Sequence, residues 1–197
     1  ILIYNILSAT KFINDLIKKE KYNFDIVCVH DWLGSIAGLV IKNETKLPVV
    51  FHTHSTEWGR SSGHGSEVVS HLENAMAENS DKIITVSYAM KEDLSRHGWQ
   101  SSKISVVWNG VDPKRYDPIN VQRQDIDQIR KKYGIPTDWN MLLFIGRLAW
   151  VKGVRNLLQA MPLVLKEFPN TKLVILGKGE AQGDIEETSD RMNIKDN

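Results

Sequence analysis

The sequence has little cysteine, little net charge and no long apolar run. Its 197 residues contain one cysteine, Cys28, which excludes an intrachain disulfide and a cysteine-based zinc cluster. Cys28 lies in the apolar run Phe24–Val29, where we expect a small, buried hydrophobic side chain. This cysteine usage fits a reducing compartment, so the expected localisation is cytoplasmic.

Charge and hydropathy argue against two further classes of protein, those that attract nucleic acid by overall charge and those that span a membrane. Lysine and arginine number 25 against 24 aspartate and glutamate residues, so the net charge of +1 provides no global field that attracts nucleic acid. No apolar stretch approaches the roughly 20 residues that span a bilayer, and no signal peptide is visible. The chain opens on Ile1 without an initiator methionine and stops at Asn197, so both ends look cut. Peripheral membrane contact through missing regions stays open.

Short apolar runs alternate with segments of helical period along the chain. The predicted strands are Asp25–Val29, Val49–His52, Lys82–Val86, Ile104–Val107, Met141–Ile145 and Lys172–Leu176. The predicted helices are Ile6–Lys19, Ser35–Asn43, Glu67–Glu78, Ala89–His97, Ile126–Tyr133, Val154–Phe168 and Gly183–Met192. Nearly continuous apolar runs are typical of strands covered on both faces. The alternation predicts an α/β fold with doubly wound parallel sheets.

The alternation breaks once, between Asp112 and Asp138, where prolines and a polar helix replace strands. We therefore predict a Rossmann-like domain over 1–112, a linker over 113–138 and the start of a second domain over 139–197. Ligands of such sheets bind beyond the carboxyl ends of the strands, so the polar residues after each run are the candidate site.

The end of the fifth run carries two cations. Gly146 lets another group approach the backbone closely, Arg147 follows, and Lys152 lies near the first turn of the next helix. Two cations and a helix N-terminus favour a phosphate or diphosphate. Two solvated surface cations are the alternative interpretation.

Four other strand-end residues are candidates. His54 and Glu57 follow the second run; a histidine there can contact a substrate hydroxyl, act as acid or base, or cap a helix. Asp31 follows the first run, where it could line a site or cap the next helix. Asn109 and Gly110 form a turn pair that requires positive φ, and residues 61–65 suggest a mobile loop.

Taken together and in order, these clusters resemble the retaining glycosyltransferases of the GT-B fold, family 4, the group that includes glycogen synthase-like enzymes. The matching segments are His30-Asp31-Trp32, His54-Ser55, Asp81–Ser87, Lys103–Asp112, Gly146-Arg147-Leu148 with Lys152-Gly153, and Gly177-Lys178-Gly179. The resemblance covers nearly the whole chain.

The resemblance implies hexosyl transfer from a nucleotide-diphosphate sugar, such as UDP-glucose or ADP-glucose, to a carbohydrate, lipid or small-molecule acceptor. Arg147 and Lys152 match the cations that hold the donor diphosphate. His54 and Asp31 match catalytic cleft positions, and Gly146, Asn109 and Glu57 are expected to line the cleft. The family usually needs no metal, and no cofactor is expected. The family's glycine-rich first loop and its Glu-x7-Glu motif are missing, so we expect no full turnover by this chain alone.

Three alternatives remain open. A GT-B sugar-nucleotide epimerase or a phosphorylase would share the fold. A dinucleotide-dependent oxidoreductase could use Gly177-Lys178-Gly179, although the third glycine of the fingerprint, Gly183, comes one residue late. A metal-dependent hydrolase could use His52 and His54 with Asp31 or Glu57, but it would leave Arg147 and Lys152 unexplained.

Overall fold

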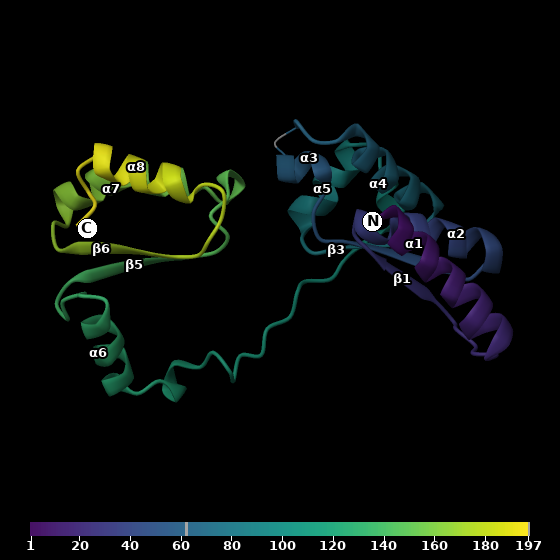
Figure 1. The fold of residues 1–197 in the computed structure, drawn as a ribbon, viewed down its shortest axis with the longest axis horizontal. Coiled ribbons are helices and arrows are strands. Elements are labelled where there is room, and N and C mark those ends of the chain that lie inside the picture. Colours follow the sequence, from purple (N-terminus) through teal and green to yellow (C-terminus); the bar gives the residue numbers. More distant parts are fainter. Residues whose placement is uncertain (62, 197) are drawn as a thin grey trace. The chain divides into compact units, whose positions relative to one another are not determined.

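The computed structural model describes residues 1–61 and 63–196. The chain divides into two compact units, Ile1–Val111 and Asp112–Asn197. The domain limits drawn from the sequence remain a prediction. Figure 1 shows the elements of both units, and each unit is described by itself below.

The first unit contains a parallel sheet of four strands in the order β1-β2-β3-β4. The strands are β1 Val27–His30, β2 Val49–Thr53, β3 Lys82–Thr85 and β4 Ile104–Val106. The helices are α1 Leu2–Thr10, a π-helix Lys11–Lys19, α2 Ser35–Thr45, α3 Glu57–Ser61, α4 Glu67–Asn79 and α5 Tyr88–Arg96. Short 3₁₀ turns lie at Trp32–Gly34 and Ser101–Lys103. The four strand positions predicted for this unit are therefore confirmed.

Local sequence sets several element ends in this unit. The Ser87 hydroxyl accepts a hydrogen bond from the backbone N–H of Met90 at 3.1 Å, which caps α5. Lys46 ends α2 in the left-handed conformation at φ 60°. The predicted helix Ile6–Lys19 is one continuous helical stretch that starts at Leu2 and changes to π geometry from Lys11 onward.

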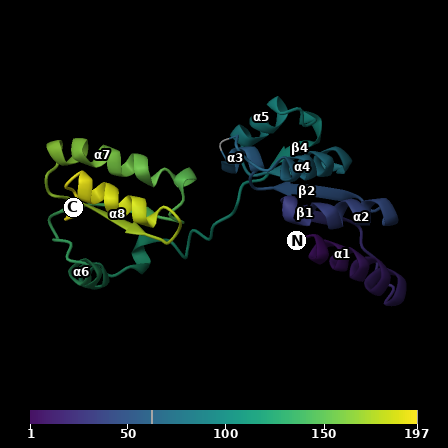
Figure 2. The ribbon, with the colours of Figure 1, turned by 45° about the horizontal axis from the view of Figure 1, so that its top comes forward.

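The core of the first unit lies on one face of the sheet. Phe51, Ile83 and Leu94 are fully buried there against Met76 of α4 and Trp99. Figure 2 shows α2, α4 and α5 beside the strands. The opposite face carries exposed or half-buried residues: Cys28, His30, Val50, His52, Lys82, Ile84 and Ser105. Within the described residues, the helices thus lie on one face of this sheet and leave the other face open.

The second unit contains two parallel strands, β5 Asn140–Ile145 and β6 Thr171–Leu176. Its helices are α6 Arg123–Lys132, α7 Val154–Glu167 and α8 Gln182–Arg191, with 3₁₀ turns at Pro118–Asn120 and Trp150–Lys152. Val154, Leu158 and Met161 of α7 pack with Ala181 and Ile185 as a second core.

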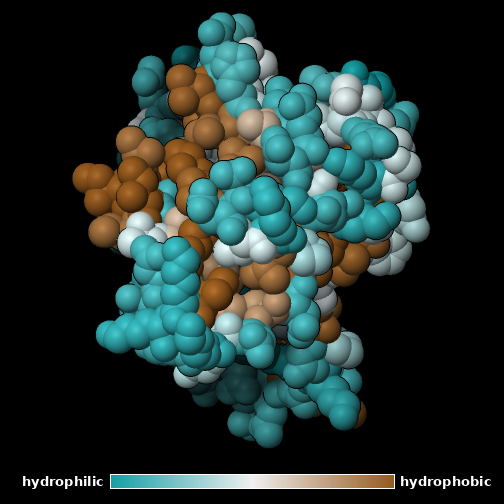
Figure 3. Space-filling model, turned by 90° about the vertical axis from the view of Figure 1, so that its right-hand side faces the viewer, coloured by the Kyte–Doolittle hydropathy of each residue, from teal (hydrophilic) through white to brown (hydrophobic). Residues whose placement is uncertain are grey.

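Exposed apolar side chains remain on both units. In β5, Met141, Leu143 and Ile145 are exposed, because α7 and α8 pack against the other face of these strands. In α1, the exposed residues include Leu2, Ile3 and Leu7. Figure 3 shows apolar residues, in brown, exposed among hydrophilic residues on the side turned toward the viewer. Among the described residues, no helix has both the length and the apolar character needed to cross a membrane.

Candidate functional site

Asp31 lies directly after β1, where its carboxylate ties two strand ends together. Its Oδ1 accepts a hydrogen bond from the backbone N–H of His54 at 2.7 Å, and its own N–H donates to the carbonyl of His52 at 3.0 Å. Asp31 has φ 51° and makes no side-chain cap to the turn that follows. The capping interpretation is therefore wrong, because the carboxylate points at the neighbouring strand instead of at its own helix.

Three histidines converge beside Asp31. The Nδ1 atom of His30 lies 3.3 Å from Nε2 of His54, and the rings of His52 and His54 stack with centroids 4.2 Å apart. Burial lowers the pKa of His52, and the neighbouring His54 and His30 lower it further. His54 is half-buried and lies beside the rings of His30 and His52.

Cys28 belongs to the same face. Its Sγ lies 3.5 Å from Nε2 of His30. Cys28 is exposed, so the prediction of a buried hydrophobic side chain is wrong. Side chains alternate along a strand, and Val29 takes the buried position against the helices, which leaves Cys28 and His30 on the other face.

Glu57 begins α3, which ends at Ser61, the first residue of the predicted mobile loop. Its backbone N–H donates to both carboxylate oxygens of Glu73, at 3.0 and 2.9 Å. Its own carboxylate accepts from Arg60 and from the backbone N–H of Ser66, both at 3.0 Å, and these contacts hold its pKa below the usual value. Both the backbone N–H and the carboxylate of Glu57 are thus hydrogen-bonded to residues of the first unit. Ser62 of the predicted loop lies outside the described residues.

Glu73 was missed at the sequence level. It is fully buried, burial raises its pKa, and Arg60 lies 3.2 Å from its Oε1. Its burial could have been predicted from its spacing in the sequence, because Glu73 shares a helix face with the core residues Met76 and Ala77.

Arg147 and Lys152 both follow the end of β5 in the second unit. Arg147 follows Gly146, and Lys152 closes the 3₁₀ turn before Gly153, whose φ of 70° starts α7. Both cations are exposed, and within 1–61 and 63–196 neither forms an ion pair or a side-chain hydrogen bond. The first backbone N–H groups of α7 point out of the helix end beside Lys152. This end of the unit can therefore hold an anion.

The backbone, instead of side chains, holds this strand end. Leu148 N–H donates to the carbonyl of Lys178 at 3.0 Å, and Ala181 N–H donates to the carbonyl of Leu148 at 2.9 Å. A Cβ atom on Gly177 would overlap the carbonyl oxygen of Gly146, and one on Gly179 would overlap that of Leu148. Another segment can thus approach the backbone at Gly146 and Leu148 closely, because the facing residues Gly177 and Gly179 have no side chain.

Asn109 does not occupy the predicted turn. Asn109 and Gly110 are exposed, and neither is among the described residues with positive φ. The chain passes through them without a turn after β4, so the turn interpretation is wrong. Within the described ranges, Asn109 makes no hydrogen bond to the histidines.

Two family models match consecutive parts of this chain. The model described as Glycosyltransferase Family 4 matches residues 2–115, which is more than half of the chain, and the model described as Glycosyl transferases group 1 matches residues 125–197. The chain belongs to glycosyltransferase family 4. The predicted family membership is confirmed.

Family 4 relatives extend well beyond this chain. An uncharacterised glycosyltransferase of Methanocaldococcus jannaschii is 32% identical over 176 residues, which are 87% of this chain and 45% of the relative. A glycogen synthase of Mycobacterium tuberculosis is 31% identical over 163 residues, 80% of this chain and 36% of the relative. The chain thus spans less than half the length of these relatives.

Solved structures support the fold. Anabaena HepE in complex with UDP matches with a TM-score of 0.76 at 18% identity, covering 95% of this chain and 49% of that one. Sucrose-phosphate synthase of Thermosynechococcus elongatus matches with a TM-score of 0.73 at 20% identity, covering 96% and 48%. The predicted α/β fold of the GT-B type is confirmed.

Proposed function

We propose that this chain is part of an enzyme that transfers a hexosyl group from a nucleotide-diphosphate sugar to an acceptor hydroxyl, with retention at the anomeric carbon. Family membership supports sugar transfer. One structural neighbour, Anabaena HepE, has been solved with UDP-glucose, which supports a nucleotide sugar as the donor class.

The observation that carries this proposal is the pair of free cations at the end of β5. In the part of the chain that the structure describes, Arg147 and Lys152 make no contact that would neutralise them. Arg147 precedes the 3₁₀ turn that leads into the N-terminus of α7, and Lys152 is the last residue of that turn. A diphosphate bound there would receive both charges and the helix dipole. As the sugar leaves, negative charge grows on the diphosphate, and the same cations would stabilise it.

In the first unit we assign the sugar-facing role to His54 and a positioning role to Asp31. The Asp31 carboxylate holds the backbone N–H of His54 at 2.7 Å, so the aspartate orients the histidine through the main chain. Gly146 is proposed to give the diphosphate access to the backbone. Glu57 is proposed to support the structure, because Arg60 and Ser66 already engage its carboxylate.

The proposal is tested by calorimetric titration of UDP and ADP into the 197-residue chain. Each charge-assisted hydrogen bond contributes about 1.5–3 kcal/mol, so Arg147→Ala and Lys152→Ala should each weaken nucleotide binding by roughly tenfold or more. Lys166→Ala removes one exposed cation from the last turn of α7 and serves as the matched control. Unchanged affinity in the Arg147 and Lys152 variants would overturn the diphosphate assignment.

We further propose that diphosphate binding needs no metal ion and that these 197 residues do not complete the transfer. The sequence contains no Glu-x7-Glu pair after Gly179. A chelator should leave nucleotide affinity unchanged. Appreciable sugar transfer by the purified chain would contradict the second statement.

A further inference from the structure

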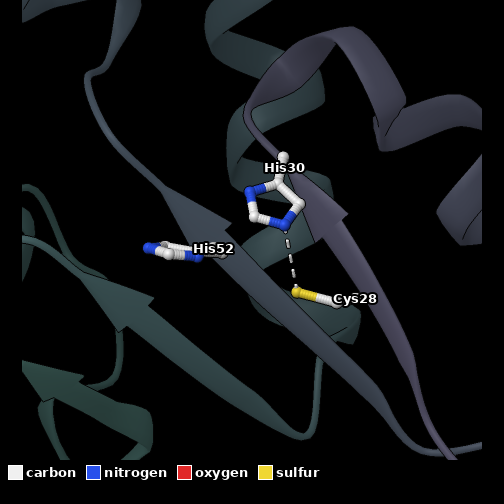
Figure 4. Close-up of side chains that lie close together, drawn as sticks. All are labelled: Cys28, His30 and His52. Atoms are coloured by element: carbon white, nitrogen blue, oxygen red, sulfur yellow. Dashed lines mark hydrogen bonds between the residues drawn. The ribbon is translucent and has the colours of Figure 1, made fainter. Parts of the chain in front are cut away.

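Cys28, His30 and His52 form a compact cluster on the uncovered face of the first sheet. Cys28 and His30 are two residues apart on β1, so both side chains leave the same face of the strand. His30 is the register partner of His52 on the adjacent parallel strand β2. One ligand atom from each of the three residues lies within 4.8 Å of the other two (Figure 4). The sheet itself therefore preorganises this cluster.

We propose that Cys28, His30 and His52 bind one divalent transition-metal ion of the zinc class. One thiolate and two imidazoles are a borderline-soft donor set, which suits Zn²⁺ and not Mg²⁺ or Ca²⁺. With the usual bond lengths of such a site, tetrahedral geometry places sulfur and nitrogen ligands about 3.5 Å apart. Cys28 Sγ and His30 Nε2 lie 3.5 Å apart. A mixed site of this kind needs only the single cysteine of the chain.

The surroundings of the cluster fit a bound cation. Among the described residues, the His52 ring stacks against His54 but makes no hydrogen bond, and its buried Nε2 atom has no partner. Metal-bound histidines usually donate their second ring N–H to a neighbouring acceptor. If His30 binds the metal through Nε2, its Nδ1 lies 3.3 Å from Nε2 of His54, which can accept that hydrogen bond.

The proposed metal site and the proposed diphosphate site are built from residues of different units. All three ligands lie within residues 28–52 of the first unit, whereas Arg147 and Lys152 belong to the second. Metal binding would still affect His54, because the hydrogen bond from His30 would fix which of the two ring nitrogens of His54 carries the proton.

The test is a titration of the tag-free 197-residue chain with Co²⁺ as a spectroscopic probe, followed by competition with Zn²⁺. We expect saturation at one ion per chain, the intense visible bands of tetrahedral cobalt and a thiolate-to-cobalt charge-transfer band in the near ultraviolet. Cys28→Ser should abolish the charge-transfer band. Cys28→Ser and His52→Gln should each weaken Zn²⁺ binding by about tenfold or more.

His71→Gln is the matched control, because His71 is exposed on α4 outside the cluster. Circular dichroism of every variant separates loss of a ligand from loss of the fold; Cys28→Ser replaces an exposed side chain by one of similar size and should stay folded. Zn²⁺ should also raise the melting temperature of the parent chain and the His71 variant more than that of the ligand variants. Absence of saturable cobalt binding, a spectrum without the thiolate band, or equal affinity in all variants would each overturn the proposal.

Discussion

At the carboxyl end of the β1–β4 sheet, carboxylate side chains add hydrogen bonds to those of the main chain, whereas the strand end of β5 is held by main-chain hydrogen bonds. In the first unit, Asp31 binds the backbone of His54, and Glu73 binds that of Glu57. In the second unit, Leu148 exchanges backbone hydrogen bonds with the loop around Lys178, and glycines allow this approach.

The difference determines which side chains remain available for ligands. Carboxylates that hold the backbone, such as Glu73 and Asp31, have partners inside the chain. Arg147 and Lys152 have no such task in the described residues, so their charges remain available for an anion. Polar residues that follow the strands therefore indicate at which edge of the sheet a ligand binds. Only the contacts of each side chain show whether it can bind a ligand or supports the fold.

The largest expected effect comes from disrupting the backbone contact of the second unit. In Gly177→Ala the new Cβ would overlap the carbonyl oxygen of Gly146, and two main-chain segments would have to move apart. We expect a loss of about 3 kcal/mol or more in the free energy of unfolding, measured by urea denaturation. Gly183→Ala is the control, because its Cβ would meet nothing within 4 Å in α8 and should stabilise the helix by about 0.5–1 kcal/mol. Similar results for the two variants would contradict the backbone argument.

A somewhat smaller effect is expected from disrupting the side-chain contacts of the first unit. Glu73→Ala removes the partner of the Glu57 N–H and of Arg60 from a fully buried position. Loss of one partner of a buried charged network costs about 3 kcal/mol, which urea denaturation would detect. Glu73→Gln keeps the shape and one acceptor, so it should lose less.

Glu78→Ala, at an exposed position of the same helix, should change the free energy of unfolding by less than about 0.5 kcal/mol. Equal stability of Glu73→Ala and Glu78→Ala would show that the buried carboxylate does not support the start of α3.

The smallest expected effect concerns Asp81, at the opposite end of the first sheet. Its carboxylate pairs with Lys42 and accepts from the backbone N–H of Val49 at 2.7 Å, and these contacts hold its pKa below the usual value. A lowered folded pKa stabilises the fold above the unfolded pKa, and this stability is lost as the pH falls through that range. Because the side chain is half exposed, Asp81→Asn should cost less than about 1 kcal/mol at neutral pH.

The cost of Asp81→Asn should shrink as the pH falls below about 4, where the parent carboxylate also becomes protonated. Thermal unfolding over a pH series measures this trend. Asp138→Asn, at an exposed site, should show no comparable trend. A penalty that stays constant down to low pH would contradict the assigned role of the charge.

Several helices and all six strands were predictable from short-range pattern. Val49–Thr53 and Lys172–Leu176 are apolar enough to be buried on at least one side in any compact fold. The short helix α3 was missed because its start depends on Glu73, which is 16 residues away from Glu57. The absence of a turn at Asn109 was also missed, since the preference of an Asn-Gly pair for a turn is weak without strands that pair on both sides.

The amino-acid sequence alone determined the α/β alternation, the family and the placement of polar residues at the ends of strands, because these depend on local periodicity and short motifs. The tertiary structure decided which of those residues are available to bind. The helices cover one face of the first sheet, so Cys28 is exposed beside His30 and His52 instead of buried. Parallel pairing of β1 with β2 brings together residues more than 20 positions apart in the sequence. Such a register cannot be predicted from the short-range sequence pattern of either strand.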